Sequence, residues 1–91
     1  MKPKKVNVLG MELDEWQNKS CVAHFGEGNE GNDWATLYDI QSTQQGKGHA
    51  TELLLTAKVY YKKRGKKVSG DVALNNRMKR LYEKVGIPEY A

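Results

Sequence analysis

The stretch that decides the fold is a turn with two glycines, Gln45-Gly46-Lys47-Gly48-His49-Ala50. An apolar segment, Trp34–Ile40, leads up to it, and an amphipathic stretch that begins at Thr51 follows directly. A strand, a glycine turn and a helix in this order present backbone N–H groups to a ligand. The first four N–H groups of a helix lack intrahelical partners and lie at the positive end of the helix dipole, and glycines allow a ligand to approach the backbone closely. The stretch therefore predicts a site that binds a cofactor by its phosphates.

The spacing of the two glycines excludes the two common nucleotide fingerprints. A P-loop needs four residues between its first glycine and a Gly-Lys-Ser/Thr triplet, and no such triplet follows Gly46 at that distance. The fingerprint Gly-x-Gly-x-x-Gly fits at its first two positions, but Thr51 stands at the third. The pattern that does fit is Gln/Arg-x-x-Gly-x-Gly/Ala, supplied by Gln45, Gly48 and Ala50. This pattern resembles the pyrophosphate loop of the GNAT superfamily of acetyl-CoA-dependent N-acetyltransferases.

A second stretch, Asn75–Ile87, resembles the later motif of the same superfamily. In that motif an Asn ends a strand, and the following helix carries Leu-Tyr-Glu-Lys before a Gly. Here the corresponding residues are Asn75, Leu81–Lys84 and Gly86. The interval between the two motifs suits one helix and one strand, and the resemblance covers Trp34–Ile87.

Composition and charge narrow the class of protein. A chain of 91 residues predicts one domain, residues 1–91. Its formal net charge of +4 suits a polyanionic cofactor such as CoA, and equally suits ordinary solubility. The single cysteine, Cys21, excludes an intramolecular disulfide and indicates a reducing compartment. No apolar run reaches the roughly 18–20 residues that span a bilayer, and no apolar core follows the charged start of the chain, so we expect a cytoplasmic protein without a membrane partner.

Hydrophobic periodicity predicts an α/β fold with a mixed sheet. The expected elements are a strand at Val6–Leu13 that is broken at Gly10, strands at Cys21–Phe25, Trp34–Ile40 and Lys67–Leu74, a turn at Asp14–Lys19, and helices at His49–Arg64 and Arg77–Val85. We expect the N-terminal strands to be antiparallel. The strand–helix–strand connection predicts a parallel pair. The result is a β-α-β-α core of the abbreviated GNAT kind.

The resemblance implies transfer of an acetyl group from acetyl-CoA to an amine by direct attack in a ternary complex, with no metal. The implied pyrophosphate contacts come from the backbone of the glycine turn and the start of the helix: Gln45, Gly46, Lys47, Gly48, His49, Ala50 and Thr51. The strands on either side of the connecting helix are expected to splay apart, with the thioester in the gap. Within the glycine turn, the charge of Lys47 suits phosphate binding, and the residue equally suits a solvated loop lysine.

Further cofactor contacts follow from the same resemblance. Main-chain groups of Tyr38, Asp39 and Ile40 would pair with the pantetheine arm as if it were another strand. Asn75 would contact that arm, although it also suits a helix cap. Arg77 would reach the nucleotide end of CoA.

Three side chains are candidates for the catalytic steps. Tyr82 matches the tyrosine that often protonates the departing thiolate in the family, and it equally suits a buried aromatic on the helix stripe. The general base is harder to assign, because Trp34 stands where family members often carry a Glu. Asp39 is the only carboxylate inside that strand, and His24 in the preceding strand has a pKa better placed for the task.

The chain is short for the family, and this leaves alternatives open. Little precedes Cys21 or follows Ile87, so we expect an acceptor side that is open or completed by a partner. That favours a protein lysine or N-terminus as acceptor, and a homodimer is also possible. The alternative function is a non-catalytic module that binds CoA or inhibits a partner protein. The basic run Lys62–Lys67 suits a solvated helix end, an acidic partner or nucleic acid, and nucleic acid ranks last because no base-stacking platform is evident.

Overall fold

The protein is a small α/β protein with a five-stranded mixed sheet and two helices. The computed structural model describes residues 2–28, 32–44, 48–71, 73 and 75–89. The elements are β1 (Lys4–Val8), β2 (Met11–Gln17), β3 (Cys21–Glu27), β4 (Trp34–Ser42), α1 (His49–Lys63), β5 (Lys67–Gly70) and α2 (Asn76–Val85). Among the described helices, none is both long enough and apolar enough to cross a bilayer.

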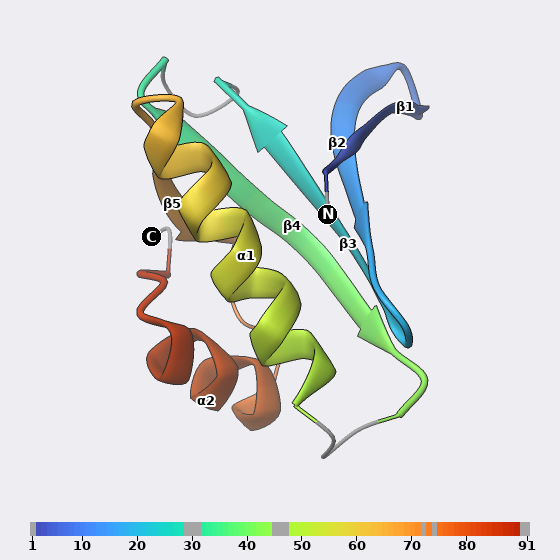
Figure 1. Ribbon diagram of the computed structural model, residues 1–91, viewed down its shortest axis with the longest axis vertical. Helices are drawn as coiled ribbons and strands as arrows, with labels where there is room; N and C mark the ends of the chain where they lie inside the picture. The colour runs from blue at the N-terminus through green and yellow to red at the C-terminus, as the bar shows by residue number, and fades with distance from the viewer. Residues whose placement is uncertain (1, 29–31, 45–47, 72, 74, 90–91) are drawn as a thin grey trace.

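The strands lie in the sheet in chain order, β1-β2-β3-β4-β5. The first four are antiparallel neighbours, and β5 pairs with β4 in parallel after the α1 connection. The predicted mixed sheet is therefore confirmed. In Figure 1, α1 lies in front of β4, and α2 packs beside the first half of α1.

The N-terminal region differs from the prediction in two ways. The break expected at Gly10 in Val6–Leu13 is present, but it separates two strands, because Leu9 and Gly10 both have positive φ angles and form a tight turn between β1 and β2. The predicted turn at Asp14–Lys19 is also wrong, since β2 continues to Gln17. The polar neighbours of Trp16 suggested a turn, but its indole is fully buried against α1.

The other predicted elements are present with small shifts in their ends. The hairpin of β3 and β4 is confirmed, and both strands are two residues longer than expected. Helix α1 begins at His49 as predicted, and α2 begins one residue early. Its N-cap is Asn75, whose side chain accepts a hydrogen bond from the Met78 N–H. Strand β5 ends at Gly70, and Val72 and Leu74, which were expected to extend it, lie outside the described residues.

The core forms between α1 and the sheet, and α2 closes one side of it. The α1 residues at helical spacing are buried as predicted: Leu53, Leu54, Ala57 and Tyr61. Cys21 is also buried in this cluster, among apolar neighbours. The exposed fraction of its residue surface is only 1%, which fits a packing role.

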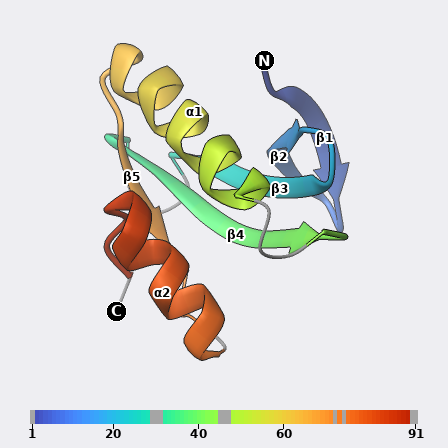
Figure 2. The ribbon, with the colours of Figure 1, turned by 60° about the horizontal axis from the view of Figure 1, so that its bottom comes forward.

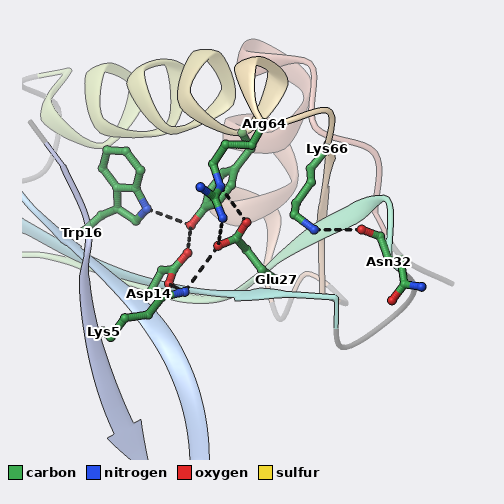
Figure 3. Close-up of polar contacts among 8 residues, drawn as sticks. Lys5, Asp14, Trp16, Glu27, Asn32, Arg64 and Lys66 are labelled. Atoms are coloured by element: carbon green, nitrogen blue, oxygen red, sulfur yellow. Dashed lines mark hydrogen bonds and ion pairs between the residues drawn. The ribbon is translucent and has the colours of Figure 1, made fainter.

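A buried polar network ties α1 to β2 (Figure 3). The Tyr61 hydroxyl accepts a hydrogen bond from the Trp16 indole N–H at 3.0 Å and donates one to Asp14 at 2.7 Å. Lys5 neutralises the other oxygen of Asp14 and also contacts Glu27. Burial raises the pKa of Tyr61, so its hydroxyl keeps the proton that it donates. Arg64 completes the network by pairing with Glu27.

Removal of the Tyr61 hydroxyl should therefore destabilise the fold. We expect Tyr61→Phe to lower the free energy of unfolding by about 1–3 kcal/mol, because the buried Asp14 oxygen and Trp16 N–H each lose a partner. Denaturant unfolding followed by tryptophan fluorescence measures the change. Tyr60→Phe is the matched control, and it should alter stability by less than about 0.5 kcal/mol. Equal effects of the two substitutions would contradict this role for the network.

Candidate functional site

A cleft of about 690 Å³ lies where β4 ends and both helices begin. Its walls are the end of β4, the first turn of α1 and the exposed side of α2. Figure 2 shows the end of β4 and the starts of α1 and α2 on the same side of the molecule. A cavity of this size falls within the usual range for small-molecule and cofactor sites, roughly 300–1,000 Å³.

Most of the predicted cofactor contacts that the structure describes line this cleft. They are Ile40, Gly48, His49, Ala50, Thr51, Asn75 and Arg77. Tyr38 and Asp39 precede Ile40 on β4 but do not line the cleft. The predictions for Gln45, Gly46 and Lys47 lie outside the described residues. Residues from both sequence motifs, far apart in the chain, thus share one cavity.

The start of α1 presents backbone donors to this cleft. The first intrahelical hydrogen bond joins the Glu52 N–H to the Gly48 carbonyl, so the N–H groups of His49, Ala50 and Thr51 have no partner within the helix. Gly48 is the N-cap and has a φ angle of 78°, which a residue with a side chain rarely adopts. These donors lie at the positive end of the helix dipole, which favours an anionic ligand.

The turn between β2 and β3 fixes the start of α1 in place. Ser20 Oγ lies 2.6 Å from His49 Nδ1, and the Asn18 amide donates to the His49 carbonyl at 2.8 Å. These contacts hold the first turn of α1 beside the end of β4. The helix start is therefore positioned by side chains that the sequence motif does not include.

Helix α2 brings a basic stripe to the same cleft. Arg77, Arg80 and Lys84 all line it, at positions i, i+3 and i+7 of the helix. No acidic residue is part of the described lining, and no ion pair between described residues involves these three side chains. Of these three cations, only Arg77 was expected from the sequence to contact the cofactor. The helical spacing of the three cations was the signal that could have identified the other two.

The parallel pairing of β4 with β5 covers only the first part of β4. Their pairing ends at Leu37 and Gly70, followed by one hydrogen bond from the Asp71 N–H to the Leu37 carbonyl. The pairing of β4 with β3 shifts at the same point, because Phe25 is opposite Leu37 whereas His24 is opposite Asp39. Tyr38 is thus the extra residue of a β-bulge, which bends a strand and disturbs its ladder locally. Beyond the bulge, β4 continues to Ser42 along the cleft.

The structure brings His24 and Asp39 together and adds Glu15. His24 Nδ1 lies 2.8 Å from Asp39, and its Nε2 lies 3.0 Å from Glu15. The three residues are cross-strand neighbours on β2, β3 and β4. They face away from α1, because Glu15 alternates with residues that contact that helix. The sequence alone did not identify Glu15, since its role depends on strand register.

This arrangement shifts the pKa of two of its members. Burial opposes the charged imidazole, but hydrogen bonds and charge from Asp39 and Glu15 outweigh it and raise the pKa of His24. The hydrogen bond from His24 lowers the pKa of Glu15. Both shifts favour a protonated His24 between two carboxylates.

Tyr82 lies at a different position. Its ring packs so closely on Gly70 that a Cβ there would be 2.5 Å from a ring carbon, so only glycine fits without rearrangement. Its hydroxyl donates to the Asp71 carbonyl at 3.0 Å. Burial raises the pKa of Tyr82 to about 12. The residue does not line the cleft, and its hydroxyl lies at the point where β5 has ended.

No family model, no curated protein and no solved structure matches the chain. The function is therefore inferred from the two sequence motifs and from the geometry of the cleft.

The His24 contacts predict a specific pH dependence of stability. Because the folded pKa of His24 is raised above its ordinary value of 6.5, its contribution is present below that pH and is lost as pH rises through the folded pKa. The folded pKa of Glu15 is lowered from 4.5, so its contribution is present above that pH and is lost as pH falls through the folded value. The stabilisation is therefore greatest between these two ordinary values.

We expect His24→Gln to be less stable than the wild type by roughly 0.5–1 kcal/mol within that window. The difference should shrink toward alkaline pH, where the wild-type imidazole is neutral. Urea unfolding of both proteins over a series of buffers measures the difference. A constant difference across the whole pH range would show that charge on His24 has no part in it.

Proposed function

We propose that this protein is an N-acetyltransferase of the abbreviated GNAT kind, which transfers an acetyl group from acetyl-CoA to an amine. The observation that carries the proposal is the shared cleft. Gly48 and Ala50 from the first motif and Asn75 from the second line one cavity. Each motif resembles the same superfamily, and the two motifs lie far apart in the sequence.

The chemistry of the cleft suits the polyanionic part of CoA. The N–H groups of His49, Ala50 and Thr51 would bind the pyrophosphate, supported by the helix dipole. Arg77 and Arg80 would contact the remaining phosphate and the nucleotide end. Charge-assisted hydrogen bonds of this kind are stronger than neutral ones, which favours a phosphate ligand over an uncharged one.

The end of the β4–β5 pairing suits the other end of the cofactor. The pantetheine arm would lie along β4 beyond Leu37, where β4 has no β5 partner, and the thioester would lie where the pairing ends. Asp39 lies two residues after Leu37 on β4, and Asp71 follows Gly70 at the end of β5. The Asp71 carbonyl accepts a hydrogen bond from the Tyr82 hydroxyl. Candidate groups for both proton transfers therefore flank the place proposed for the thioester.

In the proposed reaction, the amine nitrogen forms a bond to the thioester carbonyl carbon and the C–S bond breaks. The amine loses a proton to the exposed carboxylate of Asp39, which the protonated ring of His24 orients through their 2.8 Å contact. The leaving CoA thiolate takes a proton from Tyr82, which remains protonated at neutral pH because its pKa is raised to about 12. The hydroxyl would turn from the Asp71 carbonyl to the sulfur in that step.

The acceptor that we propose is a protein amine, either a lysine or an N-terminus. Asp39 has 53% of its side chain exposed, on the sheet face away from α1. Together with Glu15 it places negative charge beside His24. An ammonium group on the surface of another protein would be attracted to this position before it loses its proton.

Binding of the cofactor is the first test. We expect acetyl-CoA and CoA to bind with micromolar affinity in isothermal titration calorimetry. Replacing both Arg77 and Arg80 with Ala should weaken binding at least tenfold, because each charge-assisted contact contributes about 1.5–3 kcal/mol. Lys79→Ala is the matched control on the same helix, since Lys79 does not line the cleft, and it should change affinity less than twofold. Failure of the wild type to bind millimolar CoA would contradict the proposal.

Transfer is the second test, with CoA release measured against a set of lysine-containing and free-N-terminal peptides. We expect Tyr82→Phe to lower turnover about tenfold or more while acetyl-CoA affinity stays within twofold. Unchanged turnover would remove Tyr82 from the mechanism.

A second candidate function has one observation in its favour. The Tyr82 hydroxyl is already bonded to a backbone carbonyl and lies outside the cleft, as expected of a purely structural tyrosine. The protein would then be a non-catalytic module that binds CoA. Binding of CoA without transfer to any peptide would favour this function.

A further inference from the structure

A second cavity, of about 600 Å³, lies on the opposite half of α1 from the cofactor cleft, and no residue lines both. We call it the basic groove. Its apolar floor includes Trp34, Leu55, Val59 and Pro88. Its rim carries Lys58, Lys62, Lys66 and Lys67. Figure 1 shows the corresponding part of α1 beside β5.

The floor exposes large apolar side chains on one side of α1. Leu55 is 46% exposed and Val59 is 55% exposed, and the two are one helical turn apart. Neither belongs to the core cluster. Exposed apolar residues at this spacing, inside a groove, are typical of surfaces that receive a helix from another protein.

Three of the four rim lysines contact neutral groups, which hold the ammonium groups in place and leave their charges unneutralised. Lys58 Nζ donates to the carbonyls of Val85 and Gly86, and Lys66 Nζ donates to the Asn32 carbonyl. Lys67 lies over the Trp34 ring, with its Nζ 5.7 Å from the ring centroid. All of these partners are neutral.

No ion pair between described residues involves any of the four lysines, and the described lining contains no carboxylate. Ordering three of the ammonium groups in advance reduces the entropy that a binding partner would have to overcome. The groove therefore combines an apolar floor with a rim that is complementary to negative charge.

We propose that the basic groove binds an acidic amphipathic helix of another protein. Apolar side chains of that helix, spaced i and i+4, pack on Leu55 and Val59, and its flanking carboxylates pair with the rim lysines. A nucleic acid would bring phosphates against the apolar floor. A second copy of this chain, with a net charge of +4, would bring like charges together. The proposal does not depend on acetyl transfer, because the groove and the cleft share no lining residue.

The probe is an array of fluorescent acidic amphipathic peptides of about 16 residues, long enough for four helical turns. Fluorescence anisotropy should give micromolar dissociation constants for the wild-type protein. Val59→Ser and Lys62→Glu should each weaken binding at least fivefold. Lys63→Glu is the matched control, because it makes the same charge change on the same helix outside the groove. It should change affinity less than twofold.

Four results would overturn the proposal. Equal loss with Lys62→Glu and Lys63→Glu, or equal binding of peptides with the same composition in scrambled order, would show attraction by net charge alone. No binding by any peptide of the array would exclude this class of partner. Self-association in sedimentation that Val59→Ser abolishes would assign the groove to a second copy of the chain.

Discussion

The buried hydroxyl of Tyr61 is the interaction on which the arrangement of this fold depends. It joins α1 to Trp16 and Asp14 of β2, deep in the core. The other end of α1 is tied to the β2–β3 turn through His49. Because one end of α1 is attached to β2 and the other to the turn after β2, the helix has one position over the sheet. Its first turn is thereby held at the end of β4, where the cleft forms.

Charge is distributed unevenly over the structure that α1 organises. All ion pairs between described residues involve Lys5, His24 or Arg64, and they neutralise carboxylates of the sheet. Seven of the other cations line the two cavities: Arg77, Arg80 and Lys84 line the cleft, and Lys58, Lys62, Lys66 and Lys67 line the basic groove. Both cavities therefore carry positive charge, and neither described lining contains a carboxylate. Each cavity is suited to an anionic ligand. The cleft offers backbone N–H groups and arginines, which suit the phosphates of a cofactor. The basic groove offers apolar side chains flanked by lysines, which suit a protein partner.

Sequence predicted the parts of this structure whose signals are local. The helical spacing of Leu53 to Tyr61 and the cap at Asn75 were sufficient for both helices. The second half of β2, from Asp14 to Gln17, was missed because its polar residues resemble a turn, and Tyr61, the partner of Asp14, lies 47 residues away. Glu15 joins His24 only through strand register, which single-sequence patterns do not reveal. The position of Arg80 beside the cleft was predictable from the sequence, since its spacing from Arg77 places both side chains on one side of a helix.

The central claim is that the cleft between β4, α1 and α2 binds CoA by its phosphates, and a titration of labelled protein with CoA, followed by amide NMR, tests it most directly. We predict that the largest shifts occur at His49, Ala50 and Thr51, with further shifts along Arg77 to Lys84. Amides of the basic groove, such as that of Val59, should stay unchanged. Shifts confined to the basic groove, or none at millimolar CoA, would contradict the account.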